Sequence, residues 1–196
     1  RTLIDNKNKE EIEANAIAYE EGGHSIDKIL KADLIIKSPG ISDKVAIVQK
    51  ALEQGIEVIS EIEFAYRFTD KPIIAITGSN GKTTTTLLIH HFLTNGGIKT
   101  VLAGNIGSGL ARHVLTDEVD VFVVEISSFQ LDGITSFAPE TAVLLNITPD
   151  HLDRYDNDFE KYAQSKLSIF KYMISGNLVY NIEDPSGLDK ALQEIN

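Results

Sequence analysis

The chain has 196 residues and contains no cysteine, no tryptophan and a single methionine. The absence of cysteine excludes disulfides and thiolate metal sites, and it is typical of proteins from a reducing cytoplasm. Basic residues are also scarce, since 18 lysines and arginines stand against 29 acidic residues and give a net charge of −11. This balance argues against a broad phosphate-binding surface, so we expect no nucleic-acid partner.

Long hydrophobic runs are missing as well. No apolar stretch approaches the ~18 residues that cross a bilayer, and the first residues do not form a basic-then-apolar signal peptide. We therefore expect a soluble, cytoplasmic protein without a membrane partner, and nothing in the sequence implies an oligomer. Because a strand-like Thr2–Asp5 follows Arg1 at once, we also expect the chain to be part of a longer protein.

Short apolar runs alternate with helical patterns, which predicts an α/β fold. Lys71-Pro72 marks the predicted boundary between a truncated Rossmann-like domain, 1–71, and a central P-loop domain, 72–196. Apolar runs without alternation predict strands that are covered on both faces of a mostly parallel sheet. The predicted strands are Thr2–Asp5, Asp33–Lys37, Glu57–Ser60, Ile73–Thr77, Lys99–Ala103, Val121–Ile126, Thr141–Asn146 and Leu178–Asn181, and the first domain has predicted helices Glu10–Glu20 and Asp43–Gln54.

The strand Ile73–Thr77 runs into a Gly-Lys-Thr loop and then into a helical pattern. Glycines let backbone N–H groups converge on phosphate oxygens, and a helix N-terminus adds the positive end of its dipole. The common form G-x-x-x-x-G-K-[ST] would need glycine where Ile76 stands, and the alternative is a turn that caps a helix. We predict a Mg-nucleotide site made by Gly78, Ser79, Asn80, Gly81, Lys82, Thr83 and Thr84.

Polar residues follow two further strands. Glu125 ends an apolar strand, where an acid can complete the Mg²⁺ coordination that the Thr83 hydroxyl begins. Ser127 and Gln130 could orient a substrate or cap the next helix. His151 lies among carboxylates in Asn146–Asp153, which favours a metal-ligand or acid–base role; the alternative is an Asp-rich turn that caps the following helix.

Lys166 falls in the middle of an apolar helical stripe that contains Phe159, Tyr162, Ala163, Phe170 and Met173. Burial there would disfavour the charged ammonium and lower its pKa. From the sequence alone we favour snorkelling, with the amine reaching water or an acid. The sharper alternative is a neutral amine that reacts with carbon dioxide to give a carbamate, a carboxylate-like metal ligand.

Four segments together resemble the muramyl ligases of peptidoglycan synthesis: Thr77–Thr83, Gly104–Gly107, Glu125–Leu131 and Asp150–Tyr155. The shortened loop is normal in that family, so Ile76 is no objection. The Glu-Ile-Ser-Ser-Phe-Gln-Leu segment points to its D-glutamate-adding branch. The resemblance covers nearly the whole chain but less than half of such an enzyme, so we expect the start of the N-terminal domain and a C-terminal domain to lie outside it.

The resemblance implies an enzyme that uses ATP to phosphorylate the carboxylate of UDP-N-acetylmuramoyl-L-alanine, so that D-glutamate's amine can attack the acyl phosphate. By the same resemblance, Lys82 and the loop amides hold the phosphates, and Thr83 and Glu125 bind one Mg²⁺. His151 and carbamylated Lys166 bind a second Mg²⁺, which makes Lys82, His151 and Lys166 the expected catalytic residues. The expected contacts to the UDP-sugar are Asp5, Asn6, Ser38, Pro39, Gly40 and Asn105.

Two other classes of function share some of these features. A nucleotide-hydrolysing switch would also carry Lys82 and Thr83, but its guanine-reading Asn-Lys-x-Asp is absent after a suitable strand. Asp184-Pro185-Ser186-Gly187 only superficially resembles the switch motif Asp-x-x-Gly and reads as a turn. A binding module without turnover is harder to dismiss, and we expect that behaviour from these residues in isolation. Ser38-Pro39-Gly40 has its own alternative, a plain strand-to-helix turn.

Overall fold

The structure, a computed structural model, describes residues 6–115 and 118–181. Its contacts divide the chain into two compact units, one formed by residues up to Ile35 with Asp43–Val58, the other by Ile36–Ser42 with residues from Ile59 onward. The predicted strand Thr2–Asp5 and the Asp184–Gly187 turn lie outside the described residues. The domain boundary at residues 71 and 72 stays a prediction.

The first unit contains short helices, and two of them have other bounds than predicted. The helix expected over Asp43–Gln54 begins at Ala46 and ends at Glu53. The helix expected over Glu10–Glu20 begins at Asn6 and ends at Ala14. Ala16 has a left-handed φ of 54°, and the N–H groups of Ala16 and Ile17 donate to the carbonyls of Glu13 and Ile12. This Schellman pattern ends the helix early. The helices are α1 (Asn6–Ala14), α2 (Ile26–Ile29) and α3 (Ala46–Glu53). A two-stranded sheet is formed by β1 (Leu34–Lys37) and β2 (Glu57–Ser60), and the residues of both strands are divided between the two units.

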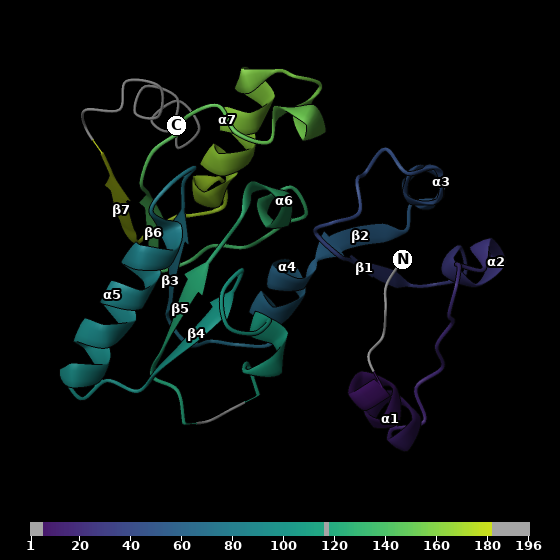
Figure 1. Ribbon diagram of the computed structural model, residues 1–196, viewed down its shortest axis with the longest axis horizontal. Coiled ribbons are helices and arrows are strands. Elements are labelled where there is room, and N and C mark those ends of the chain that lie inside the picture. The colour runs from purple at the N-terminus through teal and green to yellow at the C-terminus, as the bar shows by residue number, and fades with distance from the viewer. Residues whose placement is uncertain (1–5, 116–117, 182–196) are drawn as a thin grey trace. The chain divides into compact units, whose positions relative to one another are not determined.

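The second unit is built on a five-stranded sheet in the order β4-β5-β3-β6-β7 (Figure 1). Every neighbouring pair is parallel, which confirms the predicted α/β fold with a parallel sheet. The predicted strands agree with the observed ones to within two residues at each end. The strands are β3 (Ile73–Thr77), β4 (Thr100–Gly104), β5 (Val121–Glu125), β6 (Thr141–Leu144) and β7 (Asn177–Tyr180).

Hydrophobic side chains cover both faces of this sheet. On β3, Ile76 packs in a cluster with Ile89 and Leu93 of α5, whereas Ile73 and Ala75 join a larger cluster on the other side with α4, α6 and α7. Figure 1 shows α5 along one face of the sheet. The helices of this unit are α4 (Glu61–Tyr66), α5 (Lys82–Asn95), α6 (Ser128–Leu131) and α7 (Phe159–Leu167), with short 3₁₀ turns η1 (Leu110–Arg112), η2 (Leu152–Tyr155) and η3 (Ser168–Phe170).

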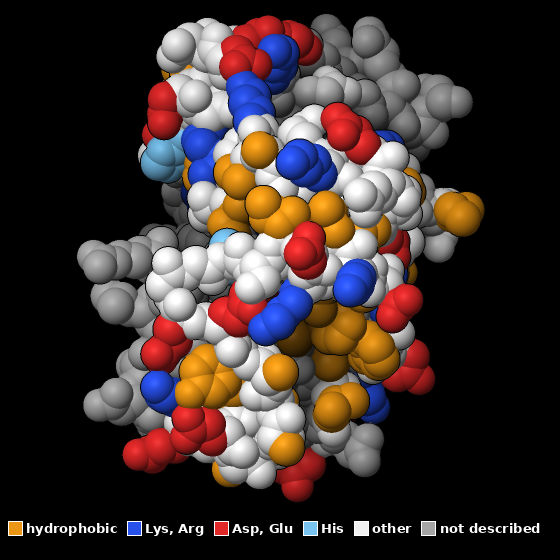
Figure 2. Space-filling model, turned by 90° about the vertical axis from the view of Figure 1, so that its right-hand side faces the viewer, with side chains coloured by type: hydrophobic (Ala, Val, Ile, Leu, Met, Phe, Trp, Pro, Cys, Tyr) orange, Lys and Arg blue, Asp and Glu red, His pale blue; other side chains and the backbone are white. Residues whose placement is uncertain are grey.

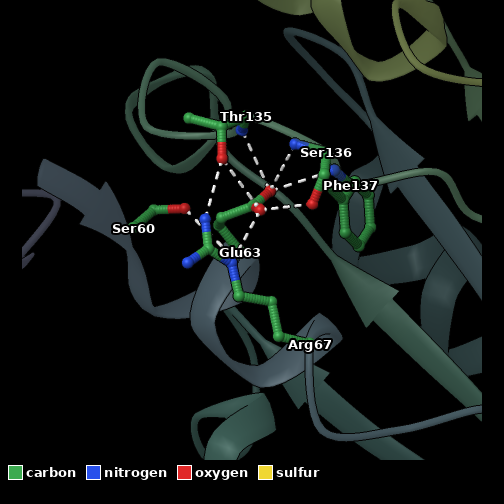
Figure 3. Close-up of polar contacts among 6 residues, drawn as sticks. All are labelled: Ser60, Glu63, Arg67, Thr135, Ser136 and Phe137. Carbon is green, nitrogen blue, oxygen red and sulfur yellow. Dashed lines mark hydrogen bonds and ion pairs between the residues drawn. The ribbon is translucent and has the colours of Figure 1, made fainter. Parts of the chain in front are cut away.

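A buried carboxylate fastens α4 to the loop after α6. Glu63 is fully buried, and its Oε2 accepts the backbone N–H groups of Thr135, Ser136 and Phe137 at 2.9–3.0 Å (Figure 3). Its Oε1 accepts both hydroxyls of that loop and the Nε–H of Arg67. Burial alone would raise the pKa of Glu63, but these hydrogen bonds outweigh it and lower the pKa to about 2. No sequence motif predicted this cluster.

One face of the molecule carries side chains of both charges (Figure 2). On the face that Figure 2 shows, Lys and Arg side chains lie among acidic and hydrophobic ones and do not gather into one broad basic area. None of the described helices is long and apolar enough to span a bilayer. Because all strands of the larger sheet are parallel, their carboxyl ends share one edge, which is where open α/β sheets place their ligand sites.

Candidate functional site

The loop between β3 and α5 has the backbone of a phosphate cradle. Gly78 and Gly81 have φ values of 150° and 84°, which disfavour side chains. A Cβ on Gly78 would also lie 3.0 Å from the Cβ of Leu145. Gly81 is the N-cap residue and provides no side-chain cap to the first turn of the 14-residue α5. The N–H groups of that turn can therefore serve an anion.

A second loop, which follows β6, holds the cradle in place. The side-chain amide of Asn146 accepts from Asn80 N at 2.9 Å and donates to Asn80 O at 3.0 Å. The Ser79 hydroxyl donates to Thr148 O at 2.8 Å and lies 2.8 Å from the Tyr162 hydroxyl. Sequence reasoning missed this supporting role of Asn146, although a polar residue directly after a central strand was a usable signal.

The predicted metal-binding pair lies together beside this loop. The Thr83 hydroxyl donates to Glu125 Oε2 at 2.8 Å, and Asn105 Nδ2 donates to Glu125 Oε1 at 2.7 Å. Glu125 is 2% exposed. Lys82 Nζ donates to the carbonyls of Gly78 and Ser79 at 2.8 and 3.0 Å. Asn105, which was expected as a substrate contact, orients the Glu125 carboxylate in this structure.

Lys166 is buried where the apolar stripe predicted it. Its side chain is 2% exposed, its Nζ donates to Gly78 O at 2.9 Å, and it lies 4.8 Å from the centre of the Tyr162 ring. The snorkelling interpretation is wrong, because the amine ends at a buried carbonyl of the cradle instead of reaching water. Burial, and then the nearby charge of Lys82, lower the pKa of Lys166 to about 8.

His151 lies on the loop that follows β6, in a left-handed conformation with φ of 48°. Strained non-glycine residues of this kind cluster at functional sites. Its side chain is 61% exposed, and Nε2 is 3.6 Å from Asp150 Oδ2. The capping alternative is wrong, because no side chain caps η2 and the N-cap of α7 is Asp158.

One cavity of about 190 Å³ brings the predicted groups together. Lys82, His151 and Lys166 all line it, although they come from three separate segments. Asn105, Ser127 and Pro39 line it too, with Ser128, Phe129, Asp150 and Tyr162. Asp5 lies outside the described residues, and Asn6 begins α1 in the other unit. Thr84 lies in the first turn of α5 and is exposed.

Ser127 and Gln130 form a capping box on α6. Gln130 Oε1 accepts from both the N–H and the hydroxyl of Ser127 at 3.0 Å, and Gln130 N donates back to the Ser127 hydroxyl at 3.3 Å. These bonds match the capping alternative for the pair. Ser127 also lines the cavity, whereas the buried Gln130 is not among its lining residues.

The oxygen atoms of Thr83 and Glu125 are suitable ligands for a hard cation. A threonine hydroxyl and one carboxylate are ligands that Mg²⁺ takes beside phosphate oxygens and waters. Within residues 6–115 and 118–181 there is no group of three or more His, Cys, Asp or Glu side chains that could hold a metal alone. The arrangement can therefore accept a metal that arrives with a phosphate ligand, and it positions two lysines and a histidine around the same space.

Comparison with known proteins gives matches to two family models and to named relatives. The family model described as Mur ligase middle domain matches residues 76–196, and the Mur ligase MurD-like N-terminal domain matches residues 2–60. Two relatives are named UDP-N-acetylmuramoylalanine–D-glutamate ligase. The one from Cytophaga hutchinsonii is 51% identical over 91% of this chain and 40% of its own length; the one from Porphyromonas gingivalis is 53% identical over 83% and 36%.

Among solved structures, MurF ligase from Thermotoga maritima in complex with ADP has a TM-score of 0.57 at 19% identity, over 85% of this chain and 49% of that one. At this identity the likeness shows the fold alone.

This chain spans less than half the length of the two ligases from Cytophaga hutchinsonii and Porphyromonas gingivalis. The two matched domains together cover nearly all of it, and they show that the chain belongs to the Mur ligase family.

Proposed function

We propose that this chain is the central part, with a portion of the N-terminal domain, of a cytoplasmic ligase that joins D-glutamate to UDP-N-acetylmuramoyl-L-alanine. The observation that carries the proposal is the single cavity lined by Lys82, His151 and Lys166. The names of the relatives from Cytophaga hutchinsonii and Porphyromonas gingivalis support the two substrates. The domain boundary at residues 71 and 72 belongs to the same proposal.

The nucleotide is ATP, and its phosphates lie on the loop Gly78–Thr84. When bound, Mg-ATP supplies the phosphoryl group that converts the substrate carboxylate into an acyl phosphate, from which the D-glutamate amine displaces phosphate. Lys82 now rests on two carbonyls of its own loop, and phosphate oxygens would compete with them for its ammonium. The first-turn N–H groups of α5 add fixed donors for the same charge. The ADP complex of the Thermotoga maritima protein supports a nucleotide here.

Two Mg²⁺ sites complete the proposal. Thr83 and Glu125, already hydrogen-bonded to each other, would hold the first. His151 and Lys166 line the same cavity and would hold the second, with Lys166 as its carbamate. As an ammonium that donates to Gly78 O, Lys166 has no lone pair with which to ligate a cation. A neutral amine can attack carbon dioxide, form an N–C bond and release one proton, which leaves an anionic carbamate.

Lys166 offers a direct test of this step. In the intact ligase, Lys166→Ala should lose ligase activity, and a short-chain carboxylate added to the variant should restore part of it. Native mass spectrometry of the wild type should show an added mass of one carbon dioxide that Lys166→Ala lacks. A fully active Lys166→Ala enzyme would refute the carbamate.

The substrate contacts remain those predicted from the sequence: Asp5, Asn6, Ser38, Pro39, Gly40, Asn105, Ser127 and Gln130. Pro39, Asn105 and Ser127 are supported by their places around the cavity. Gln130 has the weakest support, because its hydrogen bonds go to Ser127.

The experiment for the overall function uses both the intact ligase and these 196 residues. With Mg-ATP, UDP-N-acetylmuramoyl-L-alanine and D-glutamate, the intact enzyme should release phosphate in step with amide formation, and L-glutamate should not replace D-glutamate. The 196-residue chain should bind Mg-ATP in calorimetry, lose that binding in Lys82→Ala, and form no amide. Phosphate release without D-glutamate dependence would contradict the ligase, and full turnover by the 196 residues would contradict their being only part of it.

A further inference from the structure

The loop Ser38–Ile41 has every carbonyl oxygen occupied. The carbonyls of Pro39 and Gly40 accept from the two terminal nitrogens of Arg154, at 3.0 and 3.1 Å. The Ile41 carbonyl accepts from Lys37 Nζ at 2.8 Å, and the Ser38 carbonyl accepts from Ile41 N at 2.9 Å. Two cations thus hold the loop by its acceptors, and all of these residues belong to the larger unit.

Arg154 is itself held on an aromatic ring. Its guanidinium lies 4.4 Å from the centre of the Phe129 ring, a distance at which the cation is attracted to the π face. The same ring lies 5.6 Å from the His151 ring and stacks near Tyr155 at an interplanar angle of 18°. Arg154 is therefore a fixed connection between the Ser38–Ile41 loop and the segment that carries His151.

This arrangement decides what the loop can bind. A carbonyl that faces a phosphate oxygen repels it, and here the carbonyls of Pro39, Gly40 and Ile41 accept from Arg154 and Lys37. The polar groups that the loop has left include the Gly40 N–H and the Ser38 hydroxyl, which can donate to oxygen acceptors. Pro39, which lies between these two residues, lines the cavity beside Lys82 and Lys166, so the loop that carries the donors borders this cavity.

We propose that Arg154 is a positioning residue that keeps the Ser38–Ile41 loop in its donor-presenting form for an acceptor-rich substrate, the phosphate-linked sugar. The inference rests on the proposed function and adds a specificity element to it. The planar fork of arginine matches two adjacent carbonyls at once, and a lysine ammonium at this place could serve only one of them well.

The test measures binding and kinetics of the intact ligase with three variants. Arg154→Met keeps the length and apolar stem but removes the fork, Arg154→Lys keeps the charge, and Arg112→Met changes an exposed arginine on η1 as the control. We expect Arg154→Met to raise the KM and Kd for UDP-N-acetylmuramoyl-L-alanine by ~10-fold or more, and Arg154→Lys by ~3-fold. The KM for ATP should stay within about twofold in every variant.

Failure of the Arg154 role and failure of the proposed ligase function would give different results. An unchanged Kd for the UDP-sugar in Arg154→Met, or an equal rise in the KM for ATP, would overturn the positioning role. If Arg154→Met does not fold, Arg154→Lys provides the test: its KM for the UDP-sugar should rise while its KM for ATP stays within about twofold. A wild-type enzyme that binds no UDP-sugar would refute the proposed function instead, because the variants would then have no affinity to lose.

Discussion

Two glutamates of the larger unit are almost fully buried, yet their surroundings differ. Glu63 accepts six hydrogen bonds, from three backbone N–H groups, two hydroxyls and Arg67. Glu125 accepts two, from Thr83 and Asn105. A carboxylate has about four lone-pair sites, so Glu63 is saturated and Glu125 keeps capacity for a further ligand.

The kind of donor differs as well. Three consecutive N–H groups of one loop fix the Glu63 carboxylate in place (Figure 3). The donors to Glu125 are side chains, and one of them, the Thr83 hydroxyl, can itself turn to a cation as a ligand. Burial of an acid therefore does not identify a functional site. Unused acceptor capacity beside a cavity is the better indicator, and the predictions below test this difference.

The largest effect is expected at Glu125. In the intact ligase, Glu125→Gln removes the negative charge proposed to hold Mg²⁺, so amide formation should fall by at least ~100-fold. The melting temperature should change little, because an amide oxygen can still accept from Thr83 or Asn105. Steady-state kinetics and thermal unfolding measure the two effects, with Glu53→Gln on an exposed face of α3 as the control. Near-normal activity of Glu125→Gln would contradict the metal role.

Glu63 should respond in the opposite way. Glu63→Gln replaces one of the two buried carboxylate oxygens by an NH2 group, so either the three backbone N–H groups or Arg67 lose this acceptor. This change should lower the free energy of unfolding of the 196-residue chain by roughly 3–5 kcal/mol. The affinity of the folded protein for Mg-ATP should stay within about twofold. Urea denaturation gives the stability, and calorimetry under folding conditions gives the affinity. If Glu63→Gln kept full stability but lost nucleotide, the contrast between the two glutamates would be wrong.

The pH dependence of stability follows from the same cluster. The pKa of Glu63 is lowered from 4.5 to about 2, so its contribution is present above about pH 4.5 and is lost as pH falls toward 2. A shift of this size corresponds to about 3 kcal/mol. Urea denaturation of the wild type between pH 5 and pH 3 should show a loss of stability that Glu63→Gln lacks in part. If the free energy of unfolding fell equally with pH in the wild type and in Glu63→Gln, Glu63 would not be the source of the pH dependence.

Much of the site could be predicted from the sequence because its residues lie directly after apolar strands. Parallel strands end at one edge, so Gly78–Thr84, Glu125 and His151 had to lie near one another. The helical stripe likewise placed Lys166 in the core, although the pattern could not show that a buried carbonyl of the cradle would receive its amine. That contact joins residues 88 positions apart, and periodicity carries no information about it.

The residues that were missed act through long-range contacts. Asn146 supports the cradle, Arg154 holds a distant loop, and Glu63 binds a segment more than 70 residues away. Each is a polar residue on a short element, where the sequence alone favours exposure to solvent. The end of α1 was misjudged for a local reason, since alanine at a left-handed position carries none of the signal that glycine would.

The smallest effect is expected at Gln130. This residue extends the comparison of the two glutamates, because it is a buried polar residue whose hydrogen bonds cap α6, and α6 begins three residues after Glu125. Gln130→Ala removes the acceptor of the capping box and should cost ~1 kcal/mol of stability. Gln130→Glu keeps the acceptor and should cost less, so the two variants form a matched pair in urea denaturation. In the intact ligase, unchanged KM values for both variants would assign Gln130 to capping alone. A raised KM for the UDP-sugar in Gln130→Glu, which keeps the capping acceptor, would instead show that the residue contacts substrate and that a capping residue near Glu125 can also be functional.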